Sequence, residues 1–132
     1  MPNRAKDWLA QAEHDLEQSE ASRRDGRHEW ACFAAQQAAE KAVKAVHAHR
    51  SQDMLGHGIV ELLNALGVPL PATLTDKARV LDNLYIPTRY PNGHPSGAPH
   101  EHYGPIQSEQ AYGFAHEIID YARAQMAQPR DG

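Results

Sequence analysis

The sequence predicts an all-α protein: an up-and-down bundle of four to five antiparallel helices, with a long loop rich in proline and glycine before the last helix. Apolar residues recur every three or four positions through most of the chain, which is the period of an amphipathic helix. No segment alternates apolar and polar residues as a half-buried strand does. Most connections between the periodic segments are short, which favours antiparallel neighbours. The 132 residues suffice for one domain, predicted to span residues 1–132.

The first two predicted helices occupy the first third of the chain. One extends from Arg4 to about Arg24. We expect it to end at Gly26, because glycine readily adopts the left-handed conformation of the residue that ends many helices. The other extends from about His28 to His49, and its alanines allow neighbouring helices to approach closely. Glu40 and Lys41 interrupt these alanines, and we expect them to face solvent or to pair across the bundle. Four aromatic side chains on apolar stripes are expected in the core: Trp8, Trp30, Phe33 and Phe114.

Three further helices complete the predicted bundle. The third extends from about His57 to Leu66 and is expected to stop at Gly67. The fourth begins at Thr73, whose hydroxyl we expect to cap the helix, and it ends before Pro87. The last extends from about Gln107 to Ala127.

Net charge narrows the function classes. The formal charge is -4 and the isoelectric point is about 6.1, so the chain lacks the strongly basic character of proteins that bind nucleic acid tightly and without specificity. Any contact with RNA must therefore be local. A basic group follows the first helix, and we expect either a solvated turn or a docking point for an RNA backbone. Its members are Arg23, Arg24, Arg27 and His28.

Cys32 is the single cysteine, so no disulfide can form within the chain. We expect a buried, inert thiol and a reducing compartment. The N-terminal residues include no apolar leader, and no window approaches the roughly 20 apolar residues of a membrane span. The sequence thus predicts a cytoplasmic protein that does not enter a membrane. It predicts no cofactor and no resident metal.

The segment from Ile86 to Ile106 is the anomaly of the sequence. It contains five prolines and three glycines, whereas connections in helical bundles usually have only about 2 to 8 residues in total. Loops of this length tend to carry function or to be disordered. Within the segment, Arg89 and His94 are separated by four residues just past a helix end, so we expect both side chains to reach one cleft.

Arg89 and His94 have the chemistry for breaking a phosphodiester bond. An arginine holds a phosphate through two parallel hydrogen bonds, and a histidine exchanges a proton near neutral pH. This pair suits metal-independent RNA cleavage, in which His94 removes the proton of a ribose 2′-OH and Arg89 stabilises charge on the phosphorane. Six neighbouring side chains are candidates for nucleotide binding or for support: Tyr85, Tyr90, Asn92, His100, His102 and Tyr103.

Two other uses of the same loop stay open. In a noncatalytic module, Arg89 would grip a nucleotide phosphate, Tyr85 or Tyr90 would stack on a base, and His94 would be a neutral hydrogen-bond partner. In a metal site, imidazoles would hold a divalent ion, although the spacings match no metal signature known to us. The donors of that site would be His94, His100, His102 and Glu101.

Four segments of the sequence together resemble the HEPN domain family. They read WLAQAEHDL, CFAAQQAAEKAVKAV, HGIVELLNALG and TRYP, and the resemblance covers about residues 4 to 126. Its most specific part is Phe33 to Ala45, supported by His57 and by Arg89 to Pro91. The resemblance implies a bundle of four to five helices that forms a homodimer. It also implies a prokaryotic protein that is often encoded beside a minimal nucleotidyltransferase acting as its antitoxin.

The resemblance further implies a site. Many members of the family are ribonucleases with an arginine and a histidine separated by four to six residues, and Arg89 and His94 match that spacing and order. Two copies of the pair would meet at the dimer cleft. Tyr90 departs from the Asn, Asp or His that is common in active members, and Pro95 and Ser96 replace the x-Tyr that follows the histidine in some toxins. Other members with an RYP sequence are described only as nucleotide or small-ligand binders.

Overall fold

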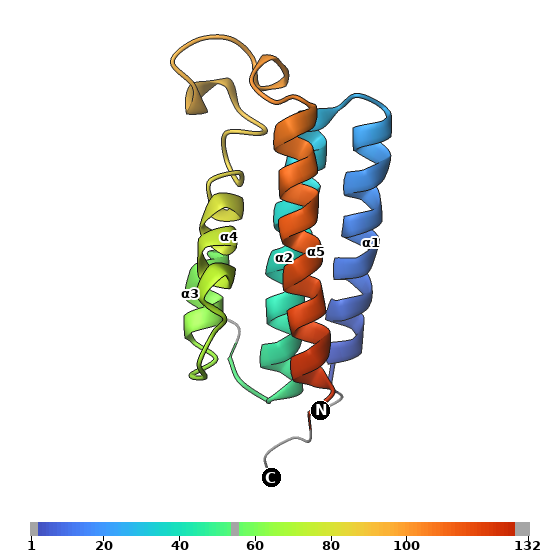
Figure 1. Cartoon of the computed structure of the whole chain (residues 1–132), viewed down its shortest axis with the longest axis vertical. Helices are drawn as coiled ribbons and strands as arrows, with labels where there is room; N and C mark the ends of the chain where they lie inside the picture. The colour runs from blue at the N-terminus through green and yellow to red at the C-terminus, as the bar shows by residue number, and fades with distance from the viewer. Residues whose placement is uncertain (1–2, 54–55, 129–132) are drawn as a thin grey trace.

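A computed structural model of the chain describes residues 3–53 and 56–128. Within these residues it contains five α-helices, two short 3₁₀ helices and no strand, so the predicted all-α class is confirmed (Figure 1). The α-helices are α1 (Ala5–Arg24), α2 (His28–His49), α3 (Ile59–Asn64), α4 (Ala72–Asp82) and α5 (Pro105–Met126). The 3₁₀ helices η1 (Pro91–Gly93) and η2 (Pro99–Glu101) lie in the loop between α4 and α5. No helix of the described chain is long and apolar enough to cross a membrane.

Helix α2 is the centre of the bundle, because it packs against all four other α-helices. The long helices α1, α2 and α5 lie side by side, α4 packs against α2 and α5, and α3 packs against α2 and α4 (Figure 1). The alanines of α2 make this arrangement possible, since small side chains let several neighbours approach one helix. Six of these alanines have no exposed surface at all: Ala31, Ala35, Ala38, Ala39, Ala42 and Ala45.

Large aliphatic side chains, and not aromatic ones, fill the remaining core. Trp30 is 48% exposed, so the prediction that it anchors the core is wrong. Close packing on alanine leaves no space for an indole, and Trp30 lies instead at the edge of a groove between α1 and α2. Trp8, Phe33 and Phe114 are half-buried, and of these Phe114 packs against the core. The largest fully buried aliphatic side chains are Ile59, Leu62, Leu63, Leu81, Ile118 and Ile119.

The helix ends follow the predicted turn chemistry in two places and depart from it in two. Gly26 and Gly67 have φ angles of 73° and 71°, the left-handed conformation that glycine adopts without strain. The predicted Thr73 cap is wrong, because α4 already begins at Ala72 and no side chain caps it. Helix α3 begins at Ile59, where the Asp82 carboxylate of α4 accepts hydrogen bonds from the backbone N–H groups of residues 59 and 60 at 2.6 and 3.1 Å.

Two members of the basic group around the turn between α1 and α2, Arg23 and His28, are held by contacts within the fold. Arg23 Nε lies 3.2 Å from the Ser108 hydroxyl at the start of α5, and His28 Nδ1 lies 2.8 Å from the same oxygen. Arg27 is paired with Asp25 at 2.9 Å. The two contacts with Ser108 fasten the turn between α1 and α2 to the first turn of α5, at the end of the bundle where the long loop lies (Figure 1). The prediction of a simple solvated turn is therefore wrong for Arg23 and His28.

Candidate functional site

Arg89 lies at the end of the turn that follows α4, and its guanidinium is fixed in place. Its Nε and Nη2 atoms both donate to the Tyr85 carbonyl, at 2.9 and 2.7 Å. Its Cζ lies 4.3, 4.7 and 5.1 Å from the ring centroids of Phe33, Tyr85 and Tyr90. Cation–π attraction to three rings holds a planar cation firmly. The Nη1 group makes no hydrogen bond within residues 3–53 and 56–128, so it stays available to an anion.

His94 lies in a second group of side chains, which we name the loop cluster (His94, His102 and Tyr103). The His94 Nε2 atom donates to the Pro87 carbonyl at 2.7 Å, and the His102 Nε2 atom donates to the Ser96 carbonyl at 2.7 Å. The two imidazoles stack at 4.0 Å with an interplanar angle of 3°, and Tyr103 meets His94 edge-on at 5.8 Å. Because a carbonyl only accepts, both Nε2 atoms carry protons. Nδ1 is therefore the atom through which each ring can take up a proton.

The structure thus divides the predicted site residues between two groups. Tyr85 and Tyr90 surround Arg89, whereas His102 and Tyr103 surround His94. The two groups share the turn after α4, since Arg89 is bonded to the carbonyl of residue 85 and His94 to that of residue 87. No hydrogen bond or ring contact between Arg89 and His94 themselves is present in the described chain.

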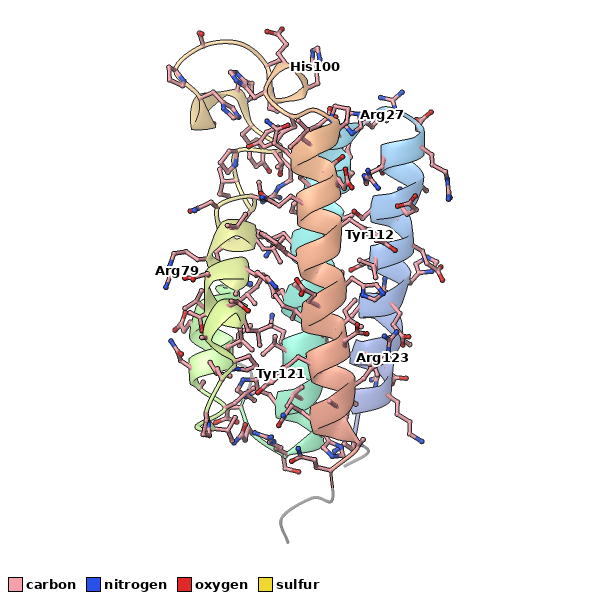
Figure 2. The ribbon with its side chains drawn as sticks, viewed as in Figure 1. Arg27, Arg79, His100, Tyr112, Tyr121 and Arg123 are labelled. Atoms are coloured by element: carbon pink, nitrogen blue, oxygen red, sulfur yellow. The ribbon has the colours of Figure 1, made fainter. Side chains whose placement is uncertain are left out.

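The remaining candidates lie at the surface of the loop. Asn92 in η1 and His100 in η2 are exposed, and neither side chain has a hydrogen bond to any described residue. His100 projects from the loop at the end of the bundle (Figure 2). The proposed metal donors do not converge, because the Nε2 atoms of His94 and His102 are both directed to backbone carbonyls. In the described residues, no group of three or more His, Cys, Asp or Glu side chains is arranged to hold a metal ion.

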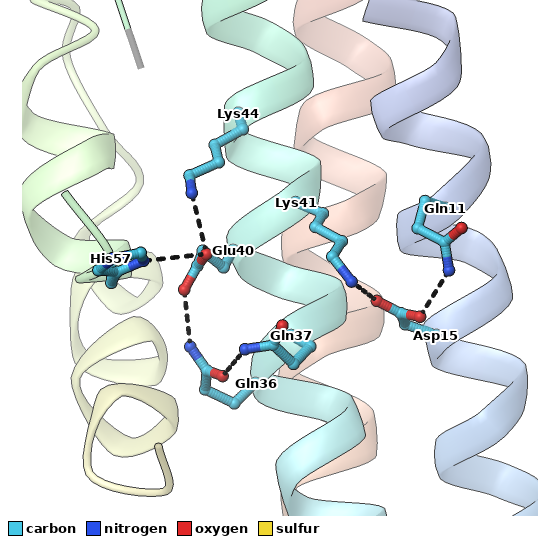
Figure 3. Close-up of polar contacts among 8 residues, drawn as sticks. All are labelled: Gln11, Asp15, Gln36, Gln37, Glu40, Lys41, Lys44 and His57. Carbon is cyan, nitrogen blue, oxygen red and sulfur yellow. Dashed lines mark hydrogen bonds and ion pairs between the residues drawn. The ribbon is translucent and has the colours of Figure 1, made fainter. Parts of the chain in front are cut away.

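A buried ion pair on α2 was not among the predicted site residues. Glu40 is 5% exposed, and its carboxylate accepts hydrogen bonds from Lys44 Nζ at 3.0 Å and from Gln36 Nε2 at 3.2 Å (Figure 3). His57 Nδ1 lies 3.8 Å from the Glu40 Oε2 atom that Lys44 also contacts. We name this group the α2 cluster (Gln36, Glu40, Lys44 and His57). Its signal in the sequence is a Glu and a Lys four residues apart within an alanine face, which places both on one side of a helix.

The α2 cluster adjoins Arg89 through one aromatic ring. The His57 and Tyr85 rings lie nearly parallel, with an interplanar angle of 11° and centroids 6.0 Å apart. The Arg89 guanidinium contacts the same Tyr85 ring. Lys41, the other charge that interrupts the alanines, does pair across the bundle as expected, with Asp15 of α1 at 2.6 Å (Figure 3).

A groove between α1 and α2 lies next to the aromatic residues that surround Arg89. It has a volume of about 460 Å³, and Trp30, Phe33 and Ala34 form its apolar part, with Lys41 and Arg27 among its polar residues. Phe33 also contacts the Arg89 guanidinium, and Trp30 meets Phe33 edge-on at 6.1 Å. Phe33 therefore both lines the groove and contacts the Arg89 guanidinium.

Cys32 has no part in this chemistry. Its side chain is fully buried, as predicted, and burial raises the pKa of the thiol to about 12, with a smaller contribution from the charge of Glu29. A thiol with this pKa has almost no thiolate at neutral pH and is a poor nucleophile.

Comparisons with known proteins agree with this architecture. The HEPN domain family matches residues 5–125 of the chain. The structure of TT1696 from Thermus thermophilus is 45% identical, with a TM-score of 0.91, and the alignment covers 94% of this chain and 99% of that one. ST0689, described as an archaeal HEPN homologue, is 36% identical with a TM-score of 0.83, covering 95% of this chain and 99% of that one.

A third similar structure is the HEPN domain protein TM0613 from Thermotoga maritima. It is 31% identical, with a TM-score of 0.77, and the alignment covers 92% of this chain and 98% of that one. No significant match was found among curated proteins.

Proposed function

The chain belongs to the HEPN domain family, and we propose that it is a metal-independent endoribonuclease whose site is built around Arg89. The observation that carries the proposal is the guanidinium itself. It is fixed by two hydrogen bonds and three aromatic rings, and Nη1 stays available. A positioned guanidinium of this kind binds phosphate and stabilises charge that develops on it.

In the proposed reaction, His94 Nδ1 takes the proton from a ribose 2′-OH. The 2′-oxygen then attacks the adjacent phosphorus, and Arg89 stabilises the charge on the nonbridging oxygens. The bond from phosphorus to the 5′-oxygen breaks, and this oxygen takes up a proton. The products are a 2′,3′-cyclic phosphate and a free 5′-OH.

Noncatalytic binding of a nucleotide or another small ligand is the second candidate. The aromatic surround of Arg89 favours it, because Tyr90 is 48% exposed and offers a face to a base beside the cation. The hydrogen bond from His94 Nε2 to the Pro87 carbonyl also favours a noncatalytic function, because it gives this imidazole a structural role in the loop.

We include in the proposal a homodimer and a minimal nucleotidyltransferase that acts as antitoxin to this chain. The surface supports the dimer. Apart from Val80, the large hydrophobic side chains that the described surface exposes all lie in segments at the loop end of the bundle (Figure 1). They are Trp30, Ile86, Tyr90 and Ile106. Apolar surface gathered at one end favours burial against a second copy, and light scattering of the purified chain should give twice the monomer mass.

Cleavage of RNA in EDTA tests the ribonuclease. We expect wild-type protein to cut total RNA, and both Arg89→Ala and His94→Ala to lose activity by about 100-fold or more. Arg79→Ala is the matched control, because this arginine lies on the outer side of α4 and pairs with Asp76 (Figure 2). If wild type does not cleave but nucleotides raise its melting temperature, and Arg89→Ala abolishes that rise, the binding module is correct.

A further inference from the structure

The proposed cleavage needs two proton transfers, and the loop cluster accounts for one of them. His94 can receive the 2′-OH proton at Nδ1, while its Nε2 proton is held by the Pro87 carbonyl. The leaving 5′-oxygen needs a separate donor, because an alkoxide is a poor leaving group. We propose that His57, oriented by Glu40, is this donor, an inference that rests on the proposed ribonuclease function.

The carboxylate behind His57 is held rigidly. Glu40 is almost fully buried, and removing a carboxylate from water carries a large desolvation penalty unless hydrogen bonds and an opposite charge compensate it. Lys44 and Gln36 supply that compensation from the same helix. Both oxygens of the carboxylate are thereby fixed, with Oε2 toward His57. Glu40 can therefore orient the imidazole without moving when a ligand arrives.

The imidazole of His57 has the form of an acid–base group. Its Nδ1 is the atom nearest Glu40, and the side chain is 72% exposed. Glu40 Oε2 lies 3.8 Å from Nδ1, within ion-pair range, and a carboxylate on that side orients the ring so that Nε2 on the other side can exchange a proton. No hydrogen bond to Nε2 is present within the described chain. Nε2 is thus free in His57, whereas in His94 the same atom donates to the Pro87 carbonyl.

His57 and Arg89 both lie beside the Tyr85 ring, and the proposal assigns His57 to the leaving-group side of a phosphate bound at Arg89. Both side chains contact the Tyr85 ring, with the guanidinium carbon 4.7 Å and the imidazole centroid 6.0 Å from its centroid. In the proposed step, the bond from phosphorus to the 5′-oxygen breaks as the His57 Nε2 proton passes to that oxygen. His94 ends protonated and His57 neutral, and exchange with water restores both.

An RNA oligonucleotide with sulfur in place of the bridging 5′-oxygen tests this role, because a thiolate leaves without protonation. We expect His57→Asn to slow cleavage of the normal linkage by about 100-fold or more and to cleave the sulfur linkage at nearly the wild-type rate. Glu40→Gln should give the same pattern with a smaller loss. Arg89→Ala should be slow on both linkages, since its role in charge stabilisation does not depend on the leaving atom.

Three outcomes overturn the inference. Equal losses on both linkages by His57→Asn would show a structural role, and unchanged rates would show none. If wild type cleaves neither linkage, the ribonuclease proposal fails, and His57 loses its role with it. His14→Asn is the matched control, because its exposed imidazole also lies near a carboxylate, that of Glu17 on the outer face of α1. Circular dichroism of each variant establishes that it is folded.

Discussion

The two imidazoles near Arg89 are held in opposite ways. In the loop cluster, His94 donates its Nε2 proton to a backbone carbonyl and is covered by two other rings. In the α2 cluster, His57 faces solvent on one side and a buried carboxylate on the other. The first arrangement fastens a loop, and the second presents a free nitrogen. His94 thus has only Nδ1 left for proton exchange, whereas His57, far away in sequence, has Nε2 free of any hydrogen bond to the described residues.

The strongest test of this contrast is removal of the carboxylate that supports the α2 cluster. Glu40→Ala should lower the free energy of unfolding by about 3 kcal/mol, because it leaves the Lys44 ammonium buried without its counterion. Urea denaturation measures the change. Asp15→Ala is the matched control, since it removes the more exposed pair with Lys41 and should cost about 1 kcal/mol.

A double variant tests whether the loss in Glu40→Ala comes from leaving the Lys44 charge unpaired. Replacing both Glu40 and Lys44 by Met should recover much of the loss, because apolar residues of similar volume avoid the desolvation penalty. A Glu40→Ala variant as stable as wild type would mean that the α2 cluster is not a buried ion pair in solution.

The loop cluster can be tested by disrupting the contact between η1 and the turn after α4. A Cβ atom at Gly93 would lie 2.9 Å from Pro87 Cα, closer than packed atoms approach. Gly93→Ala should therefore push η1 away, weaken the bond from His94 to the Pro87 carbonyl and cost on the order of 1–3 kcal/mol in urea denaturation.

Gly113→Ala is the control for that variant. Gly113 lies inside α5 with nothing within 4 Å of an added Cβ, so the change should stabilise the helix by about 0.5–1 kcal/mol. If both alanine variants behaved alike, the close approach of η1 to the turn would be wrong.

How far the sequence predicts this molecule depends on the range of each interaction. Periodicity and glycine conformation are local properties, so the helices and the ends at Gly26 and Gly67 could be predicted. The exposure of Trp30 could not, because it depends on how closely α1 and α5 pack on the alanines of α2. The cap of α3 by Asp82 is hidden for the same reason, since its partners are more than twenty residues apart.

The candidate site divides along the same line. The unusual loop and its arginine are visible as composition and spacing, and Arg89 does lie in an aromatic surround that includes the predicted Tyr85 and Tyr90. Phe33 and His57 come from other parts of the chain, and only the packed bundle brings them to that turn. Spacing also cannot reveal which ring nitrogen of His94 is engaged.

A smaller effect on stability should distinguish the two imidazoles directly. His94→Ala removes a part-buried hydrogen bond and a ring stack, so we expect a loss of about 1 kcal/mol in the free energy of unfolding. His57→Ala changes a side chain that is 72% exposed and should stay within about 0.5 kcal/mol. Hydrogen exchange of the η2 amides should rise only in His94→Ala. A loss as large in His57→Ala would assign His57 a structural role.

The smallest effect is the response of the loop side to alkaline pH. Burial raises the pKa of the Cys32 thiol from 9.0 to about 12, and burial also raises the pKa of Tyr103 above 10.0. The unfolded chain therefore loses these protons first, so stability is intact below about pH 9 and falls as pH rises toward the folded pKa values. At pH 9 the thiol alone should cost about half a kcal/mol. Urea denaturation between pH 8 and 10 should show this decline, and Cys32→Ala with Tyr103→Phe should flatten it; an unchanged slope in that double variant would place the titrating groups elsewhere.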